Sequence, residues 1–119
     1  MIKIDKRTYI TIPSKFKIEI DSVTTPDGDT VDMSTTKIIF NFADVIGNKY
    51  VCIYDPENTD TKNTNYDSDT GVLTLLFQDY FLTPGQLSCQ VGTSVPDEDF
   101  DDDEWSFFGP LQPINIVLK

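Results

Sequence analysis

In residues 15–21, charged and apolar side chains alternate without a break: Lys15-Phe16-Lys17-Ile18-Glu19-Ile20-Asp21. A period of two places successive side chains on opposite faces of a β-strand. The apolar residues of this segment therefore share one face, and the charged residues share the other. The pattern predicts a strand with one side against a core and the other in water.

Six further segments read as strands, and helices are disfavoured throughout. The chain has one alanine, Ala43, whereas Val, Ile, Thr, Phe and Tyr, which suit a pleated surface, are plentiful. The further strands are expected at 8–12, 37–42, 49–54, 71–77, 86–91 and 114–118. Segment 71–77 is apolar enough to predict a central strand covered on both faces. A short helical turn is expected near 78–81, and segment 55–65, which has no large apolar side chain, predicts an exposed connection.

Turn-forming residues separate these segments at the spacing typical of a β-sandwich. Pro26 with Gly28, and Pro84 with Gly85, combine a fixed φ with a residue that tolerates positive φ. A chain of 119 residues fits one domain. We therefore expect one all-β domain over residues 1–119, with residues 1–12 as a candidate extended segment. Its architecture is predicted to be an antiparallel β-sandwich of about seven to eight strands, immunoglobulin-like or jelly-roll-like.

The composition excludes several classes of function. The chain has no histidine, so His-based nucleophilic catalysis and His-ligated metal sites are excluded, and we expect no enzyme activity. Twenty Asp and Glu against nine Lys and Arg give a net charge of -11, which repels phosphate backbones and anionic membranes. No apolar run approaches the roughly 20 residues that cross a bilayer, and the first residues lack the apolar region of a signal peptide. We expect neither nucleic acid nor a membrane as a partner, and a protein made in a cytoplasm or in a particle assembled there.

The two cysteines, Cys52 and Cys89, form neither a CxxC motif nor a disulfide framework. Reducing compartments keep cysteines unpaired, and free cysteines are among the most buried residues. We therefore expect two free, buried thiols, with a Cys52–Cys89 bridge as the alternative.

Residues 97–104 form an acidic run that holds seven carboxylates. Calcium takes six to eight oxygen ligands, so Asp97, Asp99 and Asp101 are weak candidates for a Ca²⁺ site. An EF-hand loop also needs Gly at its sixth position and Glu at its twelfth, and this run has neither. A solvated acidic loop is the main expectation, and no other cofactor is expected.

Two aromatic groups and a basic segment supply the candidates for partner contact. Trp105 and Phe107 share one face of an alternating run, with Phe108 on the other, and aromatic residues are enriched at subunit interfaces. Residues 1–20 carry five Lys and Arg against two acids, a charge of +3 that leaves -14 for the rest. This separation suits head-to-tail contact between copies or docking onto an acidic platform, whereas core packing and scattered charges are the alternatives. The candidate partner-binding residues are Lys3, Lys6, Arg7, Tyr80, Phe81, Trp105 and Phe107.

The pattern over residues 49–118 resembles small virion proteins of tailed bacteriophages that infect gut Bacteroidota. The resemblance is carried by Tyr54-Asp55, Asp69-Thr70-Gly71-Val72-Leu73, Leu82-Thr83-Pro84-Gly85-Gln86-Leu87, the run Pro96 to Asp102, and Ile116-Val117-Leu118. The chain departs from that group after the acidic run, where it lacks an Arg-rich character. The resemblance implies a β-sandwich that attaches or forms fibres on a head or tail, with capsid, fibre or tail subunits as partners and no catalytic residues.

Three functions follow as hypotheses. The first is a non-enzymatic virion structural protein that is oligomeric, most plausibly trimeric, and works through surface contacts. The second is a carbohydrate- or calcium-binding module for a host surface, which requires exposed aromatic rings beside the carboxylates of residues 97–104. The third is an acidic mimic of nucleic acid, which requires a spaced stripe of carboxylates.

Overall fold

A computed structural model describes residues 6–21, 23–24 and 28–119, and the regular structure of these residues is all β, as expected. Nine strands are defined: β1 (Thr8–Ile10), β2 (Phe16–Ile20), β3 (Lys37–Ala43), β4 (Lys49–Tyr54), β5 (Thr64–Asp67), β6 (Val72–Phe77), β7 (Gly85–Pro96), β8 (Glu104–Phe108) and β9 (Gln112–Leu118). The short helical turn expected near 78–81 is wrong, since the described residues contain no helix. Asp79 has a φ of 52°, which is incompatible with a right-handed turn.

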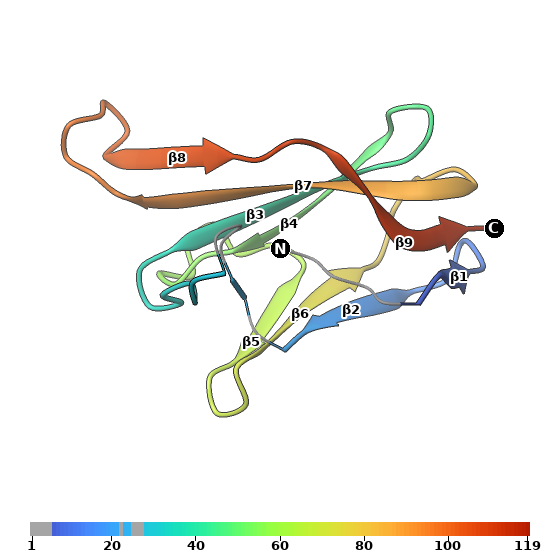
Figure 1. Ribbon diagram of the computed structural model, residues 1–119, viewed down its shortest axis with the longest axis horizontal. Helices are drawn as coiled ribbons and strands as arrows, with labels where there is room; N and C mark the ends of the chain where they lie inside the picture. Colours follow the sequence, from blue (N-terminus) through green and yellow to red (C-terminus); the bar gives the residue numbers. More distant parts are fainter. Residues whose placement is uncertain (1–5, 22, 25–27) are drawn as a thin grey trace.

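The strands form two sheets that face each other (Figure 1). One sheet has the order β1-β9-β7-β3-β4 with β8 also paired to β7, and the other has the order β2-β6-β5. Apart from β1, which runs parallel to β9, the strand pairs are antiparallel. This order matches the B-E-D and G-F-C-C′ sheets of an immunoglobulin-like sandwich, so that alternative, and not the jelly roll, describes the chain.

Strand β7 is longer than the expected 86–91 and pairs with two successive strands along one side. Its first residues pair with β9, and its last five, from Gly92 to Pro96, pair with β8. The second half of β7 and all of β8 therefore form a hairpin that runs beyond the smaller sheet (Figure 1). We call residues 92–108 the β7–β8 hairpin.

The core lies between the two sheets and is built by the predicted alternation. Phe40 and Phe42 from β3 are fully buried, as are Leu75 and Phe77 from β6. The rings of Phe42 and Phe77 pack edge to face, with their centroids 4.7 Å apart. Strand β6 is central in its sheet, as predicted, but its burial alternates along the strand. The expectation that both of its faces are covered is therefore wrong, because the side chains on the outer face of β6 are only partly buried by the described residues.

Segment 55–65 is not the wholly exposed connection that its composition predicts. Asp55 is buried, and its carboxylate accepts hydrogen bonds from Glu57 N at 3.0 Å, Thr59 Oγ1 at 2.7 Å and Asp60 N at 3.0 Å. The end of the segment belongs to β5, an edge strand that pairs with β6. Backbone pairing and a carboxylate-centred turn thus order a segment that lacks large apolar side chains.

The two cysteines are free, buried thiols, as predicted. Cys52 on β4 lies opposite Phe40 of β3, and Cys89 on β7 lies opposite Phe42, so β3 separates them within one sheet. Burial raises the pKa of each thiol to about 12. Because the thiolate is the reactive form, neither cysteine is suited to nucleophilic chemistry.

Candidate functional site

The β7–β8 hairpin exposes the aromatic pair that the sequence predicts. Trp105 and Phe107 share one face of β8, with 45% and 50% of their surfaces exposed. Their rings are nearly parallel, with an interplanar angle of 12° and centroids 6.3 Å apart. Core packing, the alternative considered for these rings, therefore does not account for them. Together they form a flat apolar surface on an edge strand, which we call the aromatic face.

The opposite face of the hairpin is covered only in part: Gly92 and Ser94 of β7 are buried, whereas Phe108 of β8 is 44% exposed. The Phe108 ring lies on Gly92, where an added Cβ would clash with Phe108 Cε1. Lys37, at the start of β3, donates a hydrogen bond from Nζ to Asp60 at 2.7 Å and lies 3.7 Å from Glu104. The bond to Asp60 raises the pKa of Lys37 although burial opposes it, so the ammonium stays charged. These contacts lie at the two ends of the hairpin, Phe108 against Gly92 at its root and Lys37 near Glu104 beside the acidic loop.

The acidic loop 97–103 at the tip of the hairpin is held by hydrogen bonds between its own residues. Asp97 N donates to Asp103 O at 2.8 Å, Asp99 N donates to Asp97 Oδ1 at 3.0 Å, and Asp103 adopts a positive φ of 59°. Within the described residues, no three side chains of the metal-binding types gather into a site. Asp97, Asp99 and Asp101, the weak candidates for a Ca²⁺ site, are thus not brought together as a group of three ligands. The loop adds six carboxylates beside the aromatic face.

The second predicted aromatic pair divides into two roles. Tyr80 packs edge-on against Phe16 and Phe77, and its hydroxyl donates to Ser14 O at 2.6 Å. Phe81, by contrast, is 91% exposed. The structure thus uses Tyr80 for packing and leaves Phe81 free for contact with a partner.

Two residues missed by the sequence analysis lie beside the loop that carries Phe81. Val45 and Ile46 are exposed in the β3–β4 turn. The side chain of Val45 lies so close to Gly85 that a Cβ added at Gly85 would clash with it. The signal available in the sequence was two consecutive β-branched apolar residues inside a turn that ends in Gly47-Asn48. We call Val45, Ile46 and Phe81 the aliphatic end.

The basic candidates precede β1, which lies toward the same end of the molecule as the β3–β4 turn (Figure 1). Lys3 lies outside the described residues, whereas Lys6 and Arg7 are exposed and directly precede β1. The last residue of β1 pairs with Leu118, which also pairs with Gly85 at the start of β7. Figure 1 shows β1 and the tip of the hairpin at opposite ends of the longest axis, whose extent is 44 Å. The basic residues of one molecule are thus remote from its own acidic loop.

The two ends of the molecule are therefore its candidate contact surfaces, one aromatic and acidic, the other aliphatic and basic. Over the residues that the structure describes, no helix has the length and apolar character to cross a membrane. A scan against models of known protein families gives no match, and a search of curated proteins gives none either.

Proposed function

We propose that this chain is a non-enzymatic structural subunit of a phage particle, where copies join head to tail as part of a fibre or decoration. The observation that carries the proposal is the complementarity between the two ends of one molecule. Trp105 and Phe107 are apolar and flanked by carboxylates, whereas the aliphatic end and the strand β1 that follows Lys6 and Arg7 lie toward the opposite end of the molecule (Figure 1). The virion setting rests on the resemblance found over residues 49–118.

The contact we propose places the aromatic face of one copy against the aliphatic end of the next. Apolar burial supplies most of the stabilisation, at about 25 cal/mol for each Å² removed from water. The carboxylates of loop 97–103 then meet Lys6 and Arg7 of the neighbour, which fixes the orientation and disfavours contact between two like ends. Since the two patches differ, the interface is heterologous and produces a closed ring, such as a trimer, or an open fibre.

A charge exchange tests this contact. Lys6→Glu with Arg7→Glu gives a copy whose two ends are both acidic. Replacing Glu98, Asp99, Asp101 and Asp102 with Lys leaves two carboxylates against four lysines in loop 97–103 and gives a copy whose hairpin is basic. We expect each variant alone to be monomeric by light scattering, and an equimolar mixture to assemble, because the acidic β1 end of one then meets the basic hairpin of the other. Lys62→Glu changes the charge at an exposed position in the connection between β4 and β5 and should leave assembly intact.

Two results would contradict the head-to-tail contact: a mixture that stays monomeric, or a control variant that loses assembly to the same degree. The measured mass of the wild-type assembly separates a closed trimer from an open fibre.

The virion setting is tested separately by location. Particles purified by density from phage-producing cells that make this chain should contain it in many copies. Immunogold labelling should place those copies on the head or the tail. Absence of the chain from purified particles would remove the virion setting, and the head-to-tail contact would still be decided by the charge exchange.

A further inference from the structure

The two outer faces of the sandwich differ in chemistry. Across the smaller sheet, the cross-strand neighbours Glu19, Thr74 and Asn65 form a polar row. Leu73 and Leu75, which flank Thr74 along β6, are fully buried, so this row points away from the core. Antiparallel sheets with one face in water show this alternation of apolar inner and polar outer residues. The outer face of the smaller sheet is therefore suited to water.

The larger sheet carries an apolar row on its outer face, the side turned away from β2, β6 and β5 (Figure 1). Ile39 of β3 lies opposite Ile53 of β4 and Gly92 of β7, and Gly92 lies opposite Phe108 of β8. Phe40, the next residue after Ile39, is fully buried, so the row points away from the core. The Phe108 ring fills the space above Gly92 and makes the row continuous over four strands.

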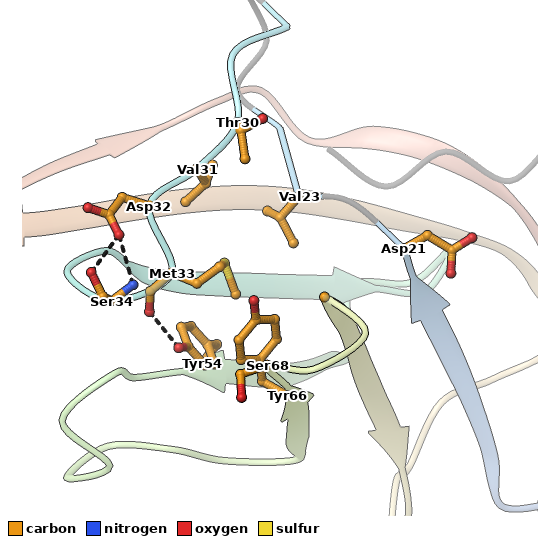
Figure 2. A pocket seen from close by; sticks show the side chains of 11 residues that line it. Asp21, Val23, Thr30, Val31, Asp32, Met33, Ser34, Tyr54, Tyr66 and Ser68 are labelled. Atoms are coloured by element: carbon orange, nitrogen blue, oxygen red, sulfur yellow. Dashed lines mark hydrogen bonds between the residues drawn. The ribbon is translucent and has the colours of Figure 1, made fainter.

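The neighbours of Ile53 along β4 point toward the smaller sheet. Tyr54 lines a pocket between the sheets with Tyr66, and its hydroxyl donates to Met33 O at 2.6 Å (Figure 2). The Tyr54 and Tyr66 rings have centroids 5.3 Å apart and an interplanar angle of 65°. Cys52, on the other side of Ile53, is fully buried. The partly buried side chain of Ile53 is thus left on the outer face.

A second row lies beside the apolar one and is uncharged. It consists of Val51, Asn41 and Gln90, which are cross-strand neighbours on β4, β3 and β7. Gln90 Nε2 donates to Gly109 O at 3.0 Å, which holds its amide group against the sheet. We call the two rows together the outer patch; its side chains are those of Ile39, Asn41, Val51, Ile53, Gln90 and Phe108.

The strands that carry the outer patch hold few charges. Strands β3, β4, β7 and β8 contain only three charged residues, Lys37, Lys49 and Glu104, each at the first position of its strand. The whole chain, by contrast, has 20 Asp and Glu and a net charge of -11. Two copies of so acidic a chain repel each other least where their carboxylates are few. The outer patch is therefore a surface on which a second copy can approach closely.

We propose that a second copy of this chain packs on the outer patch, so that two larger sheets stack face to face. A residue in a sheet covers about 16 Å², from a rise of about 3.3 Å and a strand spacing of about 4.8 Å. Strands β3, β4, β7, β8 and β9 then present roughly 600 Å² of outer face. Contact between two copies covers about 1,200 Å² in total, the lower limit of a standard interface, so the contact between two single copies is weak.

The role of this contact in an assembly rests on the proposed head-to-tail fibre. The outer patch shares no residue with the aromatic face or the aliphatic end, so copies joined head to tail keep it free. Two rows of such copies present many patches at the same spacing, and multivalency makes a weak pairwise contact stable. Lateral pairing of two rows then gives a double fibre, whereas single copies at micromolar concentration stay monomeric.

The experiment uses the Lys6→Glu with Arg7→Glu variant, labelled with ¹⁵N, because this variant does not join head to tail. Over a concentration series that reaches about 2 mM, we expect the amide signals of Ile39 and Ile53 to shift with a dimer Kd on the order of 1 mM. The signals of Asn65 and Thr74, on the other outer face, should stay in place. Added salt should strengthen the dimer, because it screens the repulsion between two acidic copies.

Variants of the outer patch, made in the same background, test the contact itself. Ile53→Lys should weaken the dimer at least tenfold, because it places an ammonium group in the apolar row. Phe108→Ser, which removes an exposed ring and adds no charge, should also weaken it. Leu76→Lys is the matched control, since Leu76 is a partly buried apolar residue on the outer face of the smaller sheet, and it should leave the Kd unchanged.

Two results would overturn lateral pairing: amide signals that do not shift up to about 2 mM, or a Leu76→Lys variant that weakens the dimer as much as Ile53→Lys does. Neither result bears on the head-to-tail contact, which the background variant lacks. Failure of the charge exchange, in turn, would remove the fibre and leave the dimer of the outer patch as measured.

Discussion

Replacing both Trp105 and Phe107 with serine is expected to convert the assembled protein into monomers without unfolding it. Each ring is about half exposed in the isolated chain, so its removal costs the fold little. In the proposed contact, the exposed half of each ring is buried against the neighbour and contributes about 2 kcal/mol. Loss of both rings should therefore weaken the contact about a thousandfold, which light scattering over a dilution series will measure.

The control for this double variant replaces a partly buried ring that lies outside the proposed contact. Tyr66→Ser removes an aromatic ring from β5, in the smaller sheet, and should leave the mass of the assembly unchanged. Phe81→Ser, at the aliphatic end, should weaken assembly although the β6–β7 loop that carries it lies away from the tip of the hairpin (Figure 1). Retained assembly in Trp105→Ser with Phe107→Ser, with unchanged circular dichroism, would show that the aromatic face is not a contact surface.

The strands of the core could be predicted because their burial follows directly from alternation. Segments 15–21 and 37–42 place an apolar residue at every second position, and each of those residues faces the opposite sheet. The prediction fails where a strand is formed by pairing alone. β5 reads Thr64-Asn65-Tyr66-Asp67, and these polar residues form a strand because the edge of β6 is available to them.

Only part of the candidate site could be predicted from the sequence. Trp105 and Phe107 stood out because aromatic rings beside seven carboxylates are unusual, and the period of two placed them on one face correctly. Val45 and Ile46 did not stand out as contact residues, since two apolar residues in a short turn resemble the end of a strand. The outer patch could not be predicted, because its residues come from four strands that become neighbours only in the folded sheet.

Asp44 is the residue whose loss should destabilise the fold most among the polar side chains. It is buried between the β3–β4 turn and the β6–β7 loop. Its Oδ1 accepts from Ile46 N at 3.1 Å and Asn48 N at 2.8 Å, and its Oδ2 accepts from Asn48 Nδ2 at 2.9 Å, Thr83 N at 2.9 Å and Thr83 Oγ1 at 3.0 Å. Burial alone would raise the pKa of this carboxyl, but the hydrogen bonds from Thr83 and Asn48 outweigh it and hold the pKa well below its ordinary value.

Asp44→Ala is therefore expected to lower the free energy of unfolding at pH 7 by about 3 kcal/mol, because three backbone N–H groups lose a charged acceptor. A carboxyl whose pKa is lower in the folded state stabilises the fold above its unfolded pKa, and this stabilisation is lost as the pH falls toward the folded pKa. The difference between the wild type and Asp44→Ala should thus shrink steadily below about pH 4. Urea unfolding followed by circular dichroism across this pH range measures both effects, with exposed Asp69→Asn as the control that changes stability by less than about 0.5 kcal/mol. A difference that stays constant down to pH 2 would mean that the charge of Asp44 does not stabilise the fold, and that the variant loses only packing.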